Sequence, residues 1–125
     1  MASLALLYQL HRRFTEARMQ YQGALSVFTQ LGDQVNINKT LTNLGLVCQE
    51  EGDLDQAYDY LEQSLTGYRE FGDVHGEANG LVNLARLCAK QGDLSKAETF
   101  AAAARTLSEK FGFADQLARL AEFNL

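Results

Sequence analysis

The residues of this sequence that could support catalysis or hold a metal ion are its two cysteines and two histidines. Cys48 and Cys88 stand forty residues apart, and the histidines are His11 and His75. A zinc site needs more ligands at close spacing than these residues provide. A Cys–His pair could act as a nucleophile and its base, but no further pattern supports one. Because buried free cysteines behave as small hydrophobic residues, we expect both cysteines in the core and both histidines exposed.

The acidic and glycine-containing stretches lack the spacing of an ion or phosphate site. The run EEGDLD at 50–55 does not have the ligand positions of a calcium loop and indicates a solvated turn. The glycines recur where helices are expected to end, and not in a phosphate-binding loop. We therefore expect no cofactor, no metal ion and no catalytic residue.

The composition is that of a folded, acidic protein. The chain has 125 residues and a formal net charge of −5. Nucleic acid and anionic membranes attract clustered Lys and Arg, so we expect neither as a partner. No apolar run reaches the roughly 20 residues needed to span a bilayer. No basic segment precedes the apolar N-terminal stretch, so a signal peptide is not expected and the predicted location is cytoplasmic.

The sequence repeats itself every forty residues. The phrase QEEGDLDQA at 49–57 returns as AKQGDLSKA at 89–97, and LTNLGLVC at 41–48 returns as LVNLARLC at 81–88. QLGD at 30–33 likewise becomes EFGD at 70–73. A fixed period of this length indicates a repeated structural unit.

Each unit has the apolar spacing of two amphipathic helices separated by a turn. From Leu54, apolar or small residues follow at offsets of 3, 4, 7, 10, 11 and 14. In EEGD, Gly52 suits the left-handed position that ends a helix, and Asp53 can cap the next one. The absence of proline also favours helices. The predicted helices are 2–11, 14–31, 34–51, 54–71, 74–91, 94–111 and 114–124.

Small residues mark the places where neighbouring helices should approach closely. Gly45 is expected to face Ala57 within one hairpin, and Ala85 to face Ala97 within the next. A single hairpin cannot bury both of its apolar stripes, whereas stacked hairpins can. The pattern therefore predicts a solenoid of helical hairpins.

The recurring positions resemble those of the tetratricopeptide repeat family. The second unit shows the family pattern as Leu41, Leu44, Gly45, Cys48, Ala57, Leu61 and Ser64, and the third as Leu81, Leu84, Ala85, Cys88, Ala97, Ala101 and Ala104. The forty-residue unit is longer than the common one and is similar to that of kinesin light chains, Pins-type adaptors and bacterial regulators. The resemblance implies an all-α, right-handed α-α superhelix in a single domain, 1–125. Its three hairpins would be 1–33, 34–73 and 74–113, followed by a capping or partial-repeat helix at 114–125.

The resemblance also implies where a partner would bind. In this family the first helix of each hairpin lines a concave groove that holds a peptide or partner helix. The matching positions are Lys39, Thr42, Asn43, Leu46, Asn79, Val82, Asn83, Arg86, Lys90 and Arg119, with Ala2, Ser3, Leu6, Gln9, Gln49, Glu50, Glu122 and Phe123 as further positions. An amide both donates and accepts, which suits Asn43 and Asn83 for contact with a peptide backbone. The alternative, that these side chains are simply solvated, stays open.

Three functions follow from the sequence. The first is a non-catalytic protein–protein interaction module whose groove binds a peptide or helix of acidic character, because the groove cations would attract carboxylates. The second is a structural segment of a larger array or regulator, or a domain that self-associates through its ends. The third and weakest is a cytosolic enzyme that uses a Cys–His pair.

Overall fold

The computed structural model describes residues 2–122, apart from the side chains of Ala2, Ser3, Gln9 and Glu122. All of the predicted helices are present, and no strand occurs within the described range. They are α1 (Ala2–Leu10), α2 (Phe14–Leu31), α3 (Gln34–Glu51), α4 (Leu54–Phe71), α5 (Val74–Lys90), α6 (Leu94–Phe111) and α7 (Ala114–Glu122). The all-α prediction is confirmed, with α1 and α5 ending one residue earlier than expected. Residues 123–125, which the predicted last helix reached, lie outside the described part.

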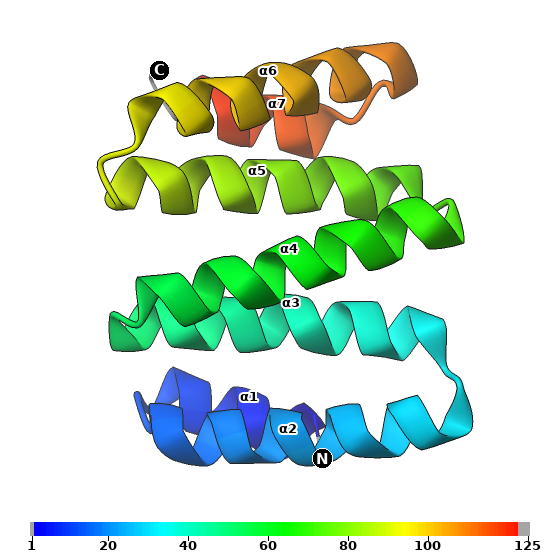
Figure 1. Cartoon of the computed structure of the whole chain (residues 1–125), viewed down its shortest axis with the longest axis vertical. Helices are drawn as coiled ribbons and strands as arrows, with labels where there is room; N and C mark the ends of the chain where they lie inside the picture. Colours follow the sequence, from blue (N-terminus) through cyan, green and yellow to red (C-terminus); the bar gives the residue numbers. More distant parts are fainter. Residues whose placement is uncertain (1, 123–125) are drawn as a thin grey trace. The chain divides into compact units, whose positions relative to one another are not determined.

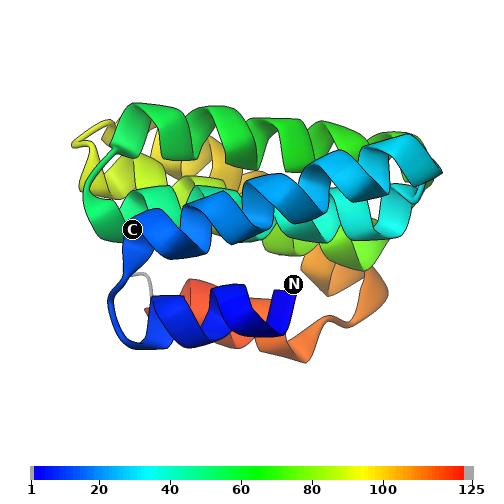
Figure 2. The ribbon, with the colours of Figure 1, turned by 90° about the horizontal axis from the view of Figure 1, so that it is seen from below.

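The chain divides into two compact units, residues 1–67 and 68–125, and the division falls within α4. In the first unit, α2 packs against both α1 and α3. The shorter helix α1 lies beside the first half of α2 and runs antiparallel to it (Figure 2). In the second unit, α6 packs against α5, and α7 contacts both of them (Figure 1). Each unit is therefore built from antiparallel neighbours, as short connections between helices require.

The predicted glycine–aspartate turns are confirmed. Gly52 ends α3 with φ of 90°, a left-handed conformation that glycine adopts without steric cost. Asp53 then caps α4, because its Oδ1 accepts a hydrogen bond of 3.2 Å from the backbone N–H of Gln56. Asp33, Asp73 and Asp93 make the same contact with the residue three positions later.

The core of the first unit joins three helices. Ala5 of α1, Ala17 and Tyr21 of α2, and Leu44 and Val47 of α3 form one buried cluster. The small residues Ala5 and Ala17 are fully buried there, as expected where two helices approach closely. This cluster fixes the position of α3, which carries the first set of predicted groove residues.

Gly45 has the close contact predicted for it. A Cβ atom on Gly45 would lie 2.6 Å from Cγ of Leu61 and 3.3 Å from the carbonyl oxygen of Ala57. Gly67 is equally crowded, because a Cβ there would overlap the amide of the buried Asn38. The sequence did not predict the second contact, since Asn38 has no counterpart among the repeated motifs.

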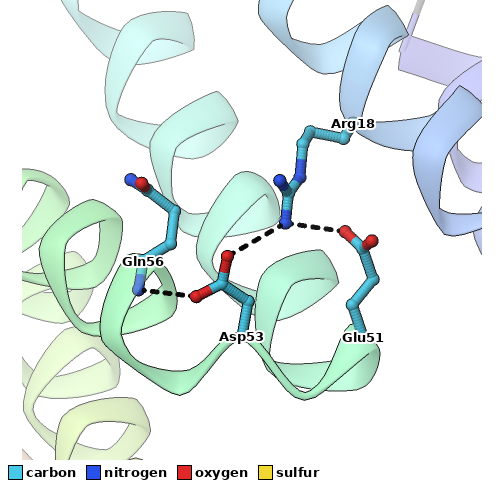
Figure 3. Close-up of polar contacts among 4 residues, drawn as sticks. All are labelled: Arg18, Glu51, Asp53 and Gln56. Atoms are coloured by element: carbon cyan, nitrogen blue, oxygen red, sulfur yellow. Dashed lines mark hydrogen bonds and ion pairs between the residues drawn. The ribbon is translucent and has the colours of Figure 1, made fainter.

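An ion-pair network ties α2 to the turn between α3 and α4. The guanidinium of Arg18 lies 2.7 Å from a carboxylate oxygen of Glu51 and 3.8 Å from one of Asp53 (Figure 3). The side chains of Arg18 and Glu51 are each about three quarters buried, so this pair is less screened by water than an exposed one.

The core of the second unit lies between α5 and α6. Ala85 and Ala97, the predicted close-approach pair, are both buried, and Leu120 of α7 is buried as well. The ring of Tyr68 covers Gly76 so closely that a Cβ atom there would overlap the ring. The same unit has an ion pair of 3.0 Å between Arg69 and Glu77. These contacts hold α5 in place for the second set of groove residues.

Candidate functional site

The predicted groove residues of the first unit lie along α3. Lys39 is exposed, and Asn43 and Leu46 are partly buried. Thr42 is buried, and its hydroxyl donates a hydrogen bond of 3.1 Å to the carbonyl oxygen of Asn38. Lys39, Asn43 and Leu46 therefore keep surface available to a ligand, whereas the side chain of Thr42 serves its own helix.

In the second unit the structure brings three predicted residues together. Arg119 of α7 donates a hydrogen bond of 2.8 Å to Oδ1 of Asn83 on α5, and its other terminal nitrogen donates to Oδ1 of Asn79. These residues are 36 and 40 positions apart in sequence. The contact forms because Asn79 and Asn83 are four residues apart and so lie on one side of α5. We call Asn79, Asn83 and Arg119 the amide–guanidinium cluster.

Because the guanidinium of Arg119 binds the oxygen of each amide, the NH2 group of each amide is the one that can contact a ligand. Arginine can only donate hydrogen bonds, so both amide oxygens of the cluster must face it. The NH2 groups of Asn79 and Asn83 donate no hydrogen bond to any described residue. Asn83 is 95% buried, so little water competes for its amide. The hydrogen bond from Arg119 therefore fixes the orientation of that amide. The cluster thus presents donors and suits a ligand that carries acceptors.

A second polar contact between α5 and α7 lies one helical turn before the cluster. The ring nitrogen Nε2 of His75 is 3.2 Å from Nε2 of Gln116, and the His75 ring packs edge-on against Phe113 with centroids 4.9 Å apart. Gln116 is buried, and its Oε1 has no hydrogen-bond partner within the described range. His75, Asn79 and Asn83 repeat every four residues, a spacing that could have indicated this face of α5 from the sequence.

Arg86 and Lys90 extend the positive character of α5 toward its C-terminus. Both side chains are exposed, and they follow Asn83 at offsets of three and seven, which places all three on one side of the helix. Val82 differs from them because its side chain is only 1% exposed and packs in the core. The second unit therefore offers two exposed cations beside the amide–guanidinium cluster, and Val82 contributes packing.

The cysteines and histidines are arranged as the sequence predicted. Cys48 and Cys88 are free and buried, and His11 and His75 are exposed. Burial raises the pKa of both thiols, which disfavours the reactive thiolate. No group of three or more metal-ligating side chains occurs in the part of the chain that the structure describes. Likewise, none of the described helices combines the length and the apolar character that a membrane span needs.

The side chains of Ala2, Ser3, Gln9 and Glu122, and the whole of Phe123, lie outside the described residues. Leu6 is exposed on α1, Gln49 is partly buried and Glu50 is exposed.

The comparisons with known proteins agree on the fold. Residues 36–110 match the family described as "Tetratricopeptide repeat". Aspartyl phosphate phosphatase F from Bacillus subtilis is similar in structure, with a TM-score of 0.89 at 18% identity over 94% of this chain and 31% of that chain. The TPR domain of Arabidopsis FLU gives 0.81 at 20% identity over 87% and 92%. BtubC (BKLC) from P. vanneervenii gives 0.83 at 24% identity over 89% and 46%.

The chain matches only part of two of these structures. The chain spans about a third of the phosphatase structure and about half of the BtubC structure. The comparison with curated proteins gave no significant match. The structural neighbours therefore support an α-α solenoid fold and carry no activity over to this chain.

Proposed function

Because the chain belongs to the tetratricopeptide repeat family, we propose that it is a non-catalytic module that binds a partner protein or peptide along the first helices of its hairpins. The proposed contact residues are Lys39, Asn43 and Leu46 on α3, Asn79, Asn83, Arg86 and Lys90 on α5, and Arg119 on α7. The cytoplasmic location expected from the sequence is part of this proposal.

The observation that carries the proposal is the amide–guanidinium cluster. Arg119 occupies the amide oxygens of Asn79 and Asn83, so the two amides offer only N–H donors to a ligand. A peptide backbone supplies carbonyl oxygens at regular intervals, and a carboxylate supplies two acceptors on one group. Both fit a row of donors on a rigid helix.

The charges beside the cluster favour an acidic ligand. Arg86 and Lys90 are exposed on the same side of α5 as Asn83, although the chain as a whole has a net charge of −5. Complementary charge speeds association and selects among partners, and charge-assisted hydrogen bonds are about twice as strong as neutral ones. We therefore propose a peptide rich in Asp and Glu, or one with a free carboxylate, as the ligand.

Selection of peptides from a displayed random library tests this proposal. We expect the full chain to enrich acidic sequences, and the affinity of a selected peptide to fall as salt rises. The double variant Arg86→Ala, Lys90→Ala should bind that peptide at least about tenfold more weakly, a loss of about 1.4 kcal/mol. Fluorescence polarisation with a labelled peptide measures this directly.

A matched control distinguishes the loss of a contact on α5 from the general loss of positive charge. Arg105 is also an exposed arginine of the second unit, but it lies on α6, the second helix of its hairpin. Arg105→Ala should leave the affinity within about twofold of the wild-type value. Equal weakening by both sets of substitutions would contradict binding along α5.

A second candidate function is that of a structural segment in a longer repeat array. The match to less than half of two longer chains favours it. In that case the library selection would give no peptide whose affinity depends on Arg86 and Lys90. The same experiment therefore distinguishes the two functions.

A further inference from the structure

The second unit exposes a large aromatic residue before each of two equivalent turns. Phe71 ends α4 and Phe111 ends α6, and they are 56% and 49% exposed. The two turns lie at the same end of the helices of this unit (Figure 1). Leu31 has the equivalent place at the end of α2 and is 72% exposed, so stacking of hairpins does not cover this position. Aromatic residues are enriched in protein interfaces, which makes this end of the second unit a candidate contact surface.

Ring contacts join the two turns. The ring of Phe113 stacks on that of Phe111, with centroids 5.9 Å apart and an angle of 17° between the planes. Phe113 also meets the ring of His75 edge-on, with centroids 4.9 Å apart. His75 is exposed in the first turn of α5, so the three rings form a row from the start of α5 to the end of α6. We call Phe71, His75, Phe111 and Phe113 the aromatic turn edge.

Charge in the second unit is divided between this edge and the remaining residues. The segments 69–77 and 109–115, which contain the edge, hold five carboxylates and two cations, whereas the rest of 68–125 holds three carboxylates and five cations. One of the two cations, Arg69, pairs with Glu77 at 3.0 Å. The other four carboxylates are all exposed, at Glu70, Asp73, Glu109 and Asp115. A row of rings accompanied by excess negative charge attracts a cationic partner.

The ring of Phe111 already attracts a cation of its own chain. Nζ of Lys110 lies 5.4 Å from the ring centroid, which is within the range of a cation–π contact. Lys110 is exposed, so its flexible side chain can leave the ring for water. An arginine fits the edge better than a lysine does, because its planar guanidinium stacks on an aromatic face and also binds a carboxylate through two hydrogen bonds.

We propose that the aromatic turn edge binds an arginine-containing segment of a partner protein. Nucleic acid and anionic lipid have the wrong charge, because the carboxylates of the edge would repel their phosphates. An uncharged segment would gain nothing from those carboxylates. On α5 the edge is about 22 Å from Lys90, since His75 and Lys90 lie near opposite ends of this helix. The inference is therefore independent of the acidic peptide proposed above.

Fluorescence polarisation with a labelled peptide that alternates Arg and Ser tests this inference. We expect the full chain to bind the peptide, with an affinity that falls as sodium chloride is added. The double variant Phe71→Ala, Phe111→Ala should bind it at least about tenfold more weakly. Replacing Arg by Lys in the peptide should weaken binding at least about threefold, because an ammonium group does not stack as a guanidinium does. Circular dichroism verifies that the variant stays helical.

Leu94→Ala is the matched control. Leu94 is 58% exposed at the start of α6, the opposite end of that helix from Phe111, so its loss should leave the affinity within about twofold of wild type. The proposal is overturned by a wild-type chain that does not bind, by a double variant that binds like wild type, or by equal binding of a peptide with Lys or Gln in place of Arg. Sedimentation velocity without peptide checks a second copy as the occupant, and a dimer that the double variant abolishes would also overturn the proposal.

Discussion

Gly45 shows how one residue sets the separation of two helices. Its missing side chain lets Leu61 of α4 lie against α3, and Leu61 is fully buried there. We expect Gly45→Ala to lower the free energy of unfolding by about 1–3 kcal/mol, because the new methyl group forces Leu61 from its site. Gly23→Ala, in the uncrowded middle of α2, should instead raise it by about 0.5–1 kcal/mol. Urea unfolding at low micromolar protein measures both, and equal effects would contradict the packing described.

The third hairpin has a different pair of residues at the same two positions. Ala85 and Ala101 occupy the positions that correspond to Gly45 and Leu61. The double variant Gly45→Ala, Leu61→Ala should therefore cost less than the sum of the two single variants, by roughly 0.5–3 kcal/mol. Strict additivity in the same urea experiment would mean that the two side chains do not meet.

The buried thiols make stability depend on alkaline pH. Burial raises the pKa of Cys48 and Cys88 in the folded protein, so the folded chain keeps these protons longer than the unfolded chain does. Stability from this source is complete below the ordinary thiol pKa of about 8.5 and is lost as the pH rises above it. We expect urea unfolding between pH 7 and pH 10 to show this decline. The slope should be smaller in the Cys48→Ala, Cys88→Ala variant, and an unchanged slope would contradict the assignment to the thiols.

At the scale of the elements, the turn between α1 and α2 departs from the other turns. Arg12 has φ of 60°, the left-handed conformation that glycine adopts at 32, 52, 72, 92 and 112. A side chain in this conformation costs roughly 1–2 kcal/mol. The turn nevertheless forms, because the backbone N–H of Arg13 donates a 2.7 Å hydrogen bond to the carbonyl oxygen of Tyr8.

Substitution of Arg12 tests whether the turn is strained. Arg12→Gly and Arg12→Ala both remove the guanidinium that lies 5.2 Å from the ring centroid of Phe14, so they differ only in backbone freedom. We expect the glycine variant to be more stable than the alanine variant by about 1 kcal/mol in urea unfolding. If the alanine variant is as stable as the glycine variant, or more stable, the left-handed conformation at position 12 is not strained.

The elements were more predictable than the site. The glycine–aspartate pair seen at Gly52 and Asp53 recurs along the chain, so the same turn signal identifies the boundaries of several helices. Side-chain environment was harder to predict, because assigning one apolar stripe per helix assumes packing on one side only. Since α5 contacts both α6 and α7, Val82 is buried although it lies off the predicted stripe. The contact of Arg119 with Asn79 and Asn83 depends on where α7 docks, which no local pattern specifies.

At the scale of the whole molecule, charge is distributed unevenly along the chain. Residues 1–32 include four charged residues, all between 12 and 18, and the remaining charges follow from Asp33 onward. The exposed cations Arg86 and Lys90 of α5 lie in the charged part of the chain, where we propose that an acidic peptide binds.

In the function that we propose, the amide–guanidinium cluster binds a peptide through the NH2 groups of Asn79 and Asn83. The most direct test is an NMR titration of the 15N-labelled chain with an acidic peptide from the library selection. The side-chain NH2 signals of Asn79 and Asn83 should shift on binding, together with backbone signals of α5, while those of α6 change little. If the peptide binds and these NH2 signals stay in place while signals of α4 or α6 shift, the peptide does not bind at Asn79 and Asn83 and the proposed contact is wrong.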